Sequence, residues 1–244
     1  MQVNWAGVFP AATTQFAADL SVDIAATQRV QEALVRDGVH GLIAMGTVGE
    51  NNSLDADEKR AVLKAAVEAV DGRVPVIVGV SELDTRRAIA FARDAERLGA
   101  DGLMLLPAMV YVPSEDELVR HFKAVAKETA LPIMLYNNPP AYRVSIGIEA
   151  IRQLAGIPNI VCLKESAPDT RRFTDLYNAV GDKIMLFAGL DDVALEGLIL
   201  GARGWVSGLT NAFPKESLAL YDAVVAGDLE TARAIYRWFM PLLH

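Results

Sequence analysis

Residues 160–166 read Ile160-Val161-Cys162-Leu163-Lys164-Glu165-Ser166, an apolar run that closes on an amine and a carboxylate. A short continuous apolar run is typical of a strand that is covered on both faces, as in a parallel sheet. Lysine is costly to bury, so Lys164 near the end of such a strand needs a reason beyond packing. The run therefore predicts a buried parallel strand whose lysine has either a chemical or an ion-pairing role.

Runs of the same kind recur along the whole chain, and each is followed by a stretch with helical spacing. The expected strands are 7–14, 41–47, 74–80, 102–107, 132–138, 160–166, 183–189 and 204–210. The expected helices are 22–36, 56–70, 85–98, 115–129, 148–154, 170–180, 193–200 and 217–226. Eight such units in about 250 residues favour an α/β fold of the TIM (β/α)8 barrel type over an open, doubly wound sheet.

The expected organisation is a barrel over residues 1–226, followed by the start of a C-terminal helical extension over 227–244. Residues 228–244 have apolar side chains at helical spacing and end on an apolar cluster at 239–243. This cluster needs cover, which either a partner chain or further helices missing from a truncated extension would provide.

The composition excludes several classes of protein. Of the 244 residues, 52% are hydrophobic, the formal net charge is -8 and no basic cluster occurs. We therefore expect small-molecule partners, and neither nucleic acid nor a membrane. One cysteine and three scattered histidines give no disulfide and no metal-ligand spacing, and no targeting segment is visible. The expected location is the cytoplasm.

Polar side chains close several expected strands, at the end of the barrel where active sites of this fold form. They include Thr47, Tyr111, Tyr136 and Lys164. If Lys164 points into the barrel, Cys162 and Ser166 share its face, whereas Leu163 and Glu165 point toward the helices. An amine in a dry interior is suited to forming a Schiff base with a carbonyl or imine substrate. The alternative is a structural lysine, snorkelling or paired with Glu50 or Glu165.

Two further segments fit Schiff-base chemistry. Tyr136 ends the neighbouring strand, where its phenol could relay protons to and from the adduct, although a lone tyrosine is more often part of the barrel rim. The turn Gly46-Thr47-Val48-Gly49-Glu50 offers backbone N–H groups for a carboxylate and the Thr47 hydroxyl as a donor. By itself such a turn is more often only a turn.

Together the turn Gly-Thr-x-Gly-Glu, the strand end Leu-Tyr-Asn-x-Pro and the strand end Leu-Lys-Glu resemble the dihydrodipicolinate synthase/N-acetylneuraminate lyase superfamily. The resemblance runs over essentially the whole chain. It implies a class I aldolase-type enzyme that needs no cofactor and assembles as a homotetramer, a dimer of dimers. It also implies Lys164 as the Schiff-base lysine, Tyr136 as the proton relay, and Thr47 as the link to a second tyrosine, Tyr111, which relatives commonly lend across a dimer interface. The residues expected to contact substrate are Val48, Gly49, Asn138, Gly189, Asp191 and Gly208.

Departures from the family pattern bear on the substrate. Ala141 stands where dihydrodipicolinate synthases usually carry an arginine for the aldehyde carboxylate, and Arg143 lies two residues later. Val48 removes one side-chain donor to the keto-acid carboxylate. The segments around Thr47, Tyr111 and Tyr136 look more like the branch that acts on 1-pyrroline-4-hydroxy-2-carboxylate in hydroxyproline breakdown.

The resemblance therefore implies a 1-pyrroline-4-hydroxy-2-carboxylate deaminase, which releases ammonia and 2-oxoglutarate semialdehyde. The alternatives are a lyase or dehydratase of a sugar-derived 2-keto acid, a 4-hydroxy-tetrahydrodipicolinate synthase, and a non-catalytic barrel that binds keto acids. Asp191 motivates the sugar-acid alternative, because it resembles the residues that hold substrate hydroxyls in N-acetylneuraminate lyases. Its other interpretation is a helix N-cap.

Overall fold

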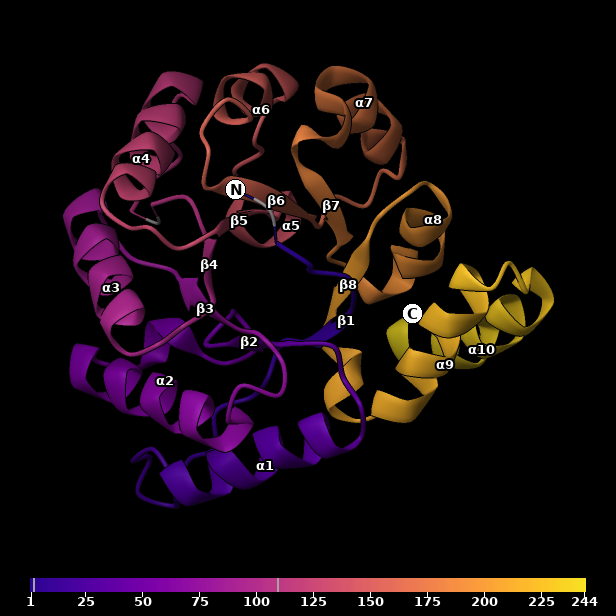
Figure 1. Cartoon of the computed structure of the whole chain (residues 1–244), viewed down its shortest axis with the longest axis horizontal. Helices are drawn as coiled ribbons and strands as arrows, with labels where there is room; N and C mark the ends of the chain where they lie inside the picture. The colour runs from indigo at the N-terminus through magenta and orange to yellow at the C-terminus, as the bar shows by residue number, and fades with distance from the viewer. Residues whose placement is uncertain (2, 109) are drawn as a thin grey trace.

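The computed structural model describes residues 1, 3–108 and 110–244, and in them eight parallel strands form one ring (Figure 1). The hydrogen-bonded order is β1-β8-β7-β6-β5-β4-β3-β2. The ring is completed between β1 and β2 by a parallel bridge from Ala11 to Ile43, where Ala12 N donates to Ile43 O at 2.9 Å. The strands are β1 (Gly7–Pro10), β2 (Leu42–Ala44), β3 (Val76–Val80), β4 (Gly102–Leu105), β5 (Ile133–Asn137), β6 (Ile160–Glu165), β7 (Met185–Ala188) and β8 (Gly204–Ser207). The predicted TIM barrel is confirmed.

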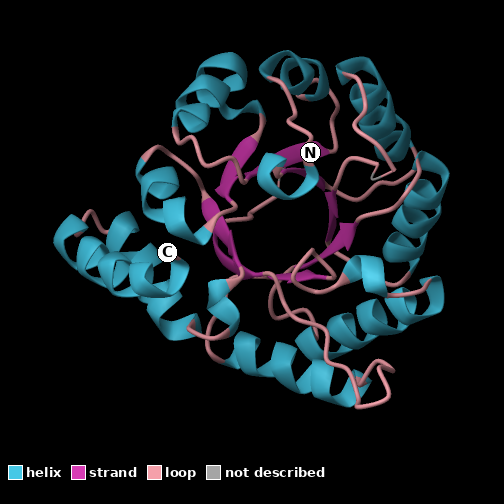
Figure 2. Ribbon diagram, turned by 180° about the vertical axis from the view of Figure 1, so that it is seen from behind, coloured by secondary structure: helices cyan, strands magenta, loops and turns pink. Residues whose placement is uncertain are grey.

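The helices surround this ring on its outer side (Figure 2). They are α1 (Ile24–Arg36), α2 (Ala56–Val70), α3 (Thr85–Arg97), α4 (Glu115–Lys127), α6 (Ile148–Leu154), α7 (Arg171–Val180), α8 (Ala194–Ile199), α9 (Pro214–Val225) and α10 (Leu229–Leu243). The shorter elements are α5 (Pro139–Tyr142) and the 3-10 turns η1 (Asn51–Ser53), η2 (Gly181–Lys183), η3 (Asp191–Val193) and η4 (Leu209–Asn211). None of these short elements was predicted from the sequence, and the strand predicted over 204–210 ends at Ser207, before η4. The helix α5 lies within the ring of outer helices near the ends of β5 and β6 (Figure 1).

Two apolar clusters hold the barrel together. The inner one fills the ring of strands and includes Phe9, whose ring packs edge-to-face on Phe187 at 5.4 Å between centroids. The outer one lies between the strands and the helices and includes Leu163 and Trp205. Cys162 belongs to the inner cluster and Leu163 to the outer one, which confirms the alternation predicted for β6. Burial raises the pKa of the Cys162 thiol, so this residue packs as a small apolar side chain.

One irregularity in β6 sets the register that matters for the site. Ile133 of β5 pairs with Ile160, but the next residue, Met134, pairs with Cys162. One extra residue, Val161, is therefore accommodated in β6, as in a β-bulge. Because of this shift, Lys164 is the partner of Tyr136, and a regular ladder would have placed Leu163 there.

The C-terminal helix α10 covers part of its own apolar residues. Phe239 is buried against Phe213, and the Tyr236 hydroxyl donates to Glu196 Oε2 of α8 at 2.9 Å. Trp238 packs edge-to-face on Phe213 but, like Leu242, stays more than half exposed. The apolar cluster predicted at residues 239–243 is thus partly covered within the chain. In the described residues, no helix combines the length and the apolar character that a membrane crossing requires.

Candidate active site

Lys164 and Tyr136 meet at the C-terminal ends of β6 and β5. Both are buried, with 5% and 4% of their surface exposed, and they are register partners on adjacent strands. Lys164 Nζ lies 3.8 Å from the centroid of the Tyr136 ring. A cation over an aromatic face at this distance is attracted by the ring, which orients the amine without a carboxylate partner.

The ion pairs considered as a structural role for Lys164 are not present in the structure. Glu165 points outward, where its carboxylate pairs with Arg172 Nε of α7 at 2.9 Å and accepts from Asn137 Nδ2 at 2.7 Å. In the part of the chain that the structure describes, Lys164 has no ion pair with Glu165 or Glu50. The two neighbouring charged residues therefore have separate roles, and Glu165 locks β6 to α7.

The environment of Tyr136 favours a proton-transfer role. Asn138 Nδ2 donates to the phenol oxygen at 2.8 Å. Burial would raise the pKa of Tyr136, but the charge of Lys164 and the polar groups of Lys164, Ser166 and Asn138 outweigh it and hold the pKa below its ordinary value. The Ser166 hydroxyl is one of the groups that lower the pKa of Tyr136. Its oxygen, Ser166 Oγ, has no hydrogen-bond partner in the described residues. The phenol can therefore give up and regain a proton beside the amine.

Gly189 leaves the space that the lysine side chain occupies. A Cβ at this position would lie 2.8 Å from Lys164 Cγ and 2.1 Å from Ser166 Oγ, well inside ordinary contact. Its backbone N donates to Glu165 O at 2.9 Å, which fixes the loop after β7 against the end of β6. The structure thus brings Gly189, predicted to contact substrate, against the amine-bearing side chain.

Thr47 is held by a tyrosine that the sequence analysis did not identify. The Thr47 hydroxyl shares a short hydrogen bond with the hydroxyl of Tyr142, the last residue of α5. The Tyr142 ring packs edge-to-face with the Tyr136 ring, at 5.8 Å between centroids. Burial raises the pKa of Tyr142 to about 12, so its phenol stays protonated at neutral pH. The missed signal was the pair of prolines after Asn138, because Pro at the first helical position after an Asn cap is typical of a helix start.

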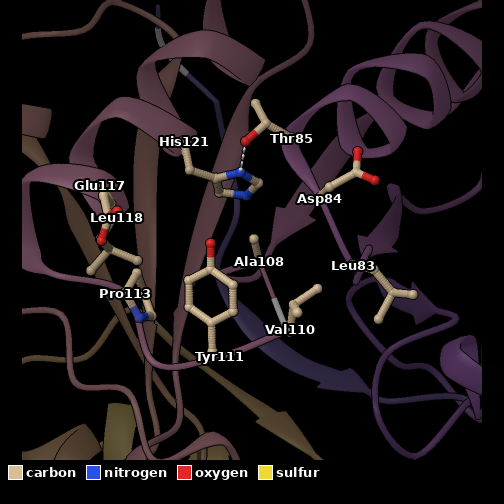
Figure 3. Close-up of a pocket in the computed structure, with 10 residues that line it drawn as sticks. All are labelled: Leu83, Asp84, Thr85, Ala108, Val110, Tyr111, Pro113, Glu117, Leu118 and His121. Carbon is tan, nitrogen blue, oxygen red and sulfur yellow. Dashed lines mark hydrogen bonds between the residues drawn. The ribbon is translucent and has the colours of Figure 1, made fainter.

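Tyr111 lies elsewhere in this chain. Its side chain is 73% exposed and lines a surface hollow of about 240 Å³ together with His121, Thr85 and Leu83. Its hydroxyl points toward the His121 ring (Figure 3). The structure does not bring Tyr111 next to Lys164 within the chain, and its delivery to the site of a neighbouring subunit stays a prediction.

Asp191 lies over β8 and does not cap the helix that follows it. Its carboxylate accepts from Trp205 Nε1 and from Leu209 N, each at 3.0 Å, and α8 has no side-chain cap. The helix-cap interpretation is therefore wrong for that helix. Burial raises the pKa of Asp191, and the hydrogen bonds and the charge of Lys164 act in the opposite direction. Gly208 lies nearby, since a Cβ there would meet Asp191 Oδ2 at 3.5 Å and Val48 Cγ2 at 3.6 Å.

The turn that carries Thr47 is fastened to its surroundings through backbone contacts. Gly49 has no room for a side chain, because a Cβ would lie 2.8 Å from Ala12 O. Thr14 Oγ1 donates to Gly49 O at 2.7 Å, and Asn51 Nδ2 donates to Gly79 O at 2.9 Å. These contacts explain the glycine and hold the turn in place.

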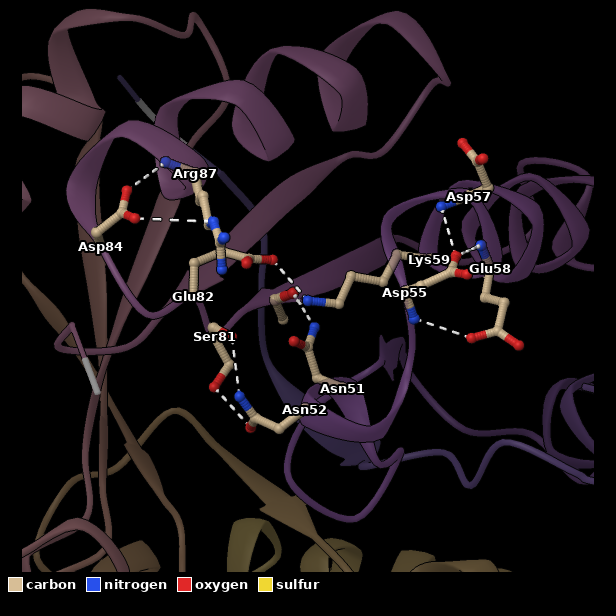
Figure 4. A network of polar contacts seen from close by, with 11 residues as sticks. Asn51, Asn52, Asp55, Asp57, Glu58, Lys59, Ser81, Glu82, Asp84 and Arg87 are labelled. Carbon is tan, nitrogen blue, oxygen red and sulfur yellow. Dashed lines mark hydrogen bonds and ion pairs between the residues drawn. The ribbon is translucent and has the colours of Figure 1, made fainter. Parts of the chain in front are cut away.

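A polar network continues beyond the turn (Figure 4). Asn52 Nδ2 donates to Ser81 O at 3.1 Å, and the buried Lys59 ammonium pairs with Glu82 Oε1 at 2.6 Å. The network ties the start of α2 to the end of β3, so the segment after Thr47 is anchored to the neighbouring strand.

A parallel barrel with a buried lysine at the end of β6 and a tyrosine beside it has the fold of class I aldolases, which act through a Schiff base. Within that class the chain belongs to the dihydrodipicolinate synthetase family, whose model matches residues 4–244.

Relatives of known name share about a third of their residues with the chain. It is 34% identical over 241 residues to a 4-hydroxy-tetrahydrodipicolinate synthase of Desulforamulus reducens, covering 98% of the chain and 81% of the relative. It is 35% identical over 244 residues to an uncharacterized DapA-like lyase of Rhizobium meliloti, covering 100% of the chain and 81% of the relative.

Solved structures agree. The dihydrodipicolinate synthase of Aquifex aeolicus superposes with a TM-score of 0.94 at 32% identity, covering 98% of the chain and 82% of that structure. The chloride-inhibited enzyme of Acinetobacter baumannii, complexed with pyruvate, superposes with a TM-score of 0.93 at 31% identity, covering 97% and 81%.

Proposed function

We propose that this protein is a Schiff-base lyase or deaminase in which Lys164 attacks the C2 carbon of a 2-keto acid or a cyclic imino acid. The position of Lys164 Nζ carries the proposal: it lies 3.8 Å from the Tyr136 ring, and no carboxylate among the described residues forms an ion pair with it. The pyruvate complex of the Acinetobacter baumannii relative supports a small keto acid as the ligand class.

The proposed substrate is 1-pyrroline-4-hydroxy-2-carboxylate. Lys164 adds to C2, and cleavage of the bond between C2 and the ring nitrogen leaves a lysine imine at C2 and a free amine on C5. Tyr136 moves protons as C3 loses one and the C4 hydroxyl leaves as water, with the iminium accepting the electron pair. Tautomerisation forms an imine at C5, and hydrolysis at C5 and at C2 releases ammonia and 2-oxoglutarate semialdehyde. One water is lost and two are consumed.

The absence of a cation at position 141 supports this substrate over an aldehyde that brings its own carboxylate. Ala141 lies in α5, close to Tyr142, and supplies no charge for such a group. The names of the relatives support the second candidate, 4-hydroxy-tetrahydrodipicolinate synthase. The sugar-acid alternative has less support, because both carboxylate oxygens of Asp191 already accept protein N–H groups.

Borohydride trapping tests the chemistry. Incubation with pyruvate and borohydride should add one reduced adduct at Lys164, located by peptide mass. Lys59 is an internal control, since it is also buried but is paired with Glu82 at 2.6 Å, and it should stay unmodified. An unmodified Lys164 would eliminate the Schiff-base proposal.

Three parallel assays then choose the substrate. The first supplies pyrroline-4-hydroxy-2-carboxylate and measures ammonia together with the semialdehyde, the second supplies pyruvate with aspartate semialdehyde, and the third a sugar-derived 2-keto acid. Trapping at Lys164 without ammonia release would reject the deaminase activity but leave the proposal of a Schiff-base lyase intact. The expected assembly is a homotetramer, and light scattering of the purified protein would measure its mass. The expected location is the cytoplasm.

A further inference from the structure

The hydroxyl partner of Thr47 decides whether one chain contains a complete proton path. The family resemblance assigns that partner to Tyr111, which is 73% exposed and lines a separate hollow with His121. The structure instead places the hydroxyl of Tyr142 in a short hydrogen bond with Thr47 Oγ1.

The local sequence holds Tyr142 in a defined relation to Tyr136. Asn138 Oδ1 accepts from Ala141 N at 3.3 Å and so caps α5, while Asn138 Nδ2 donates to the Tyr136 phenol at 2.8 Å. Tyr142 N donates to Asn138 O at 3.0 Å, which closes the single turn. Prolines at the first helical positions restrict φ and keep the turn rigid. One asparagine therefore connects the phenol beside the lysine to the helix that carries the second phenol.

The contacts of Tyr142 join two loops across the barrel mouth. Its hydroxyl contacts Thr47 in the loop after β2, and its ring packs at 88° to the ring of Tyr136, which lies near the end of β5. Since β2 and β5 are separated by β3 and β4 in the ring, this contact bridges strands that do not pair. The raised pKa of Tyr142, caused mainly by burial, keeps its proton in place, whereas the charge of Lys164 helps to lower the pKa of Tyr136.

We propose that Tyr142 is a positioning residue that links Thr47 to Tyr136 within one chain and holds the Tyr136 phenol over Lys164. This inference rests on the proposed Schiff-base function. Within one chain, Tyr142 then takes the place beside Thr47 that the family resemblance assigns to Tyr111.

Exchange of the pyruvate methyl protons in D2O tests the link, because it requires the Schiff base and proton transfer at C3 but not the natural substrate. Tyr142→Phe keeps the ring and removes the hydroxyl. It should slow exchange at saturating pyruvate by roughly tenfold, the scale of one lost hydrogen bond. The pyruvate concentration at half-saturation and the final amount of borohydride adduct at Lys164 should not change, whereas a general loss of structure would raise the first and lower the second.

Thr47→Val should slow exchange to a similar degree, and the double variant should be no slower than the slower single one, because both substitutions break the same hydrogen bond. Tyr177→Phe is the matched control, an exposed tyrosine on α7, and should exchange at the wild-type rate.

Two results would overturn the inference while leaving the lyase proposal intact. One is wild-type exchange in Tyr142→Phe when Tyr111→Phe is slow, which would assign the path to a second copy. The other is a double variant whose loss is the product of the two single losses. Failure of wild-type Lys164 to form the adduct would instead refute the proposed function, and the inference with it.

Discussion

Replacement of Gly189 by alanine should displace the reactive amine without touching the amine itself. The added methyl would lie 2.1 Å from Ser166 Oγ, 2.8 Å from Lys164 Cγ and 3.0 Å from Glu165 O, whereas ordinary contact begins at 3.4 Å. The Ser166 hydroxyl can rotate away. The lysine stem and the backbone carbonyl cannot both yield, because Lys164 and Glu165 lie in a strand with neighbours on both sides.

The size of the effect follows from these overlaps. Lys164 Cγ must move by about 0.6 Å to reach ordinary contact, and an amine displaced on the scale of 1 Å from its reactive position loses about 10²-fold in rate. Overpacking of this kind also destabilises a fold by about 1–3 kcal/mol. We expect Gly189→Ala to trap pyruvate at Lys164 about 10²-fold more slowly and to remain folded.

The assay is the rate of borohydride-trapped adduct, followed by intact mass, together with urea unfolding. Gly156→Ala is the matched control, since an added Cβ there meets nothing within 4 Å. In a Ser166→Ala background the hydroxyl oxygen nearest to the added methyl is gone, but the contact with Lys164 Cγ remains. The effect of Gly189→Ala on the free energy of unfolding should therefore shrink more than its effect on the trapping rate. Wild-type trapping by Gly189→Ala would refute the idea that Gly189 sets the position of the lysine.

Three other predictions follow from named contacts. Tyr136→Phe should lower turnover by about 10² to 10⁴ in steady-state assays if its phenol relays protons, and unchanged turnover would reduce it to packing. Glu165→Ala leaves Arg172 without its ion-pair partner and largely buried, so the free energy of unfolding in urea should fall by about 3–5 kcal/mol. A fall below about 1 kcal/mol would contradict the proposal that this ion pair holds β6 against α7. Burial lowers the pKa of His121 in the folded protein, so the unfolded chain binds more protons at about pH 6.5. The free energy of unfolding should therefore fall as pH drops from about 6.5 through the folded pKa of His121. This pH dependence should disappear in His121→Gln, and identical pH dependence in the two proteins would exclude it.

The local pattern of apolar residues was sufficient to predict the barrel and the inward direction of the Lys164 side chain. Burial on both faces leaves a continuous apolar run in the sequence, and all eight such runs became strands. Alternation along a strand is also local, which is why the outward direction of Glu165 was predictable. The assignments of substrate contacts such as Asn138 and Gly208 stay predictions, because they depend on a ligand.

The motifs placed Tyr136 near Lys164, but only the tertiary structure decided the register of that pair and the partner of Thr47. The extra residue Val161 places Lys164 opposite Tyr136, and α5 selects Tyr142 as the partner of Thr47 where the sequence suggested Tyr111. Register and loop path depend on packing between segments far apart in the chain, so periodicity, which reports only which face of a segment is buried, could not reveal them.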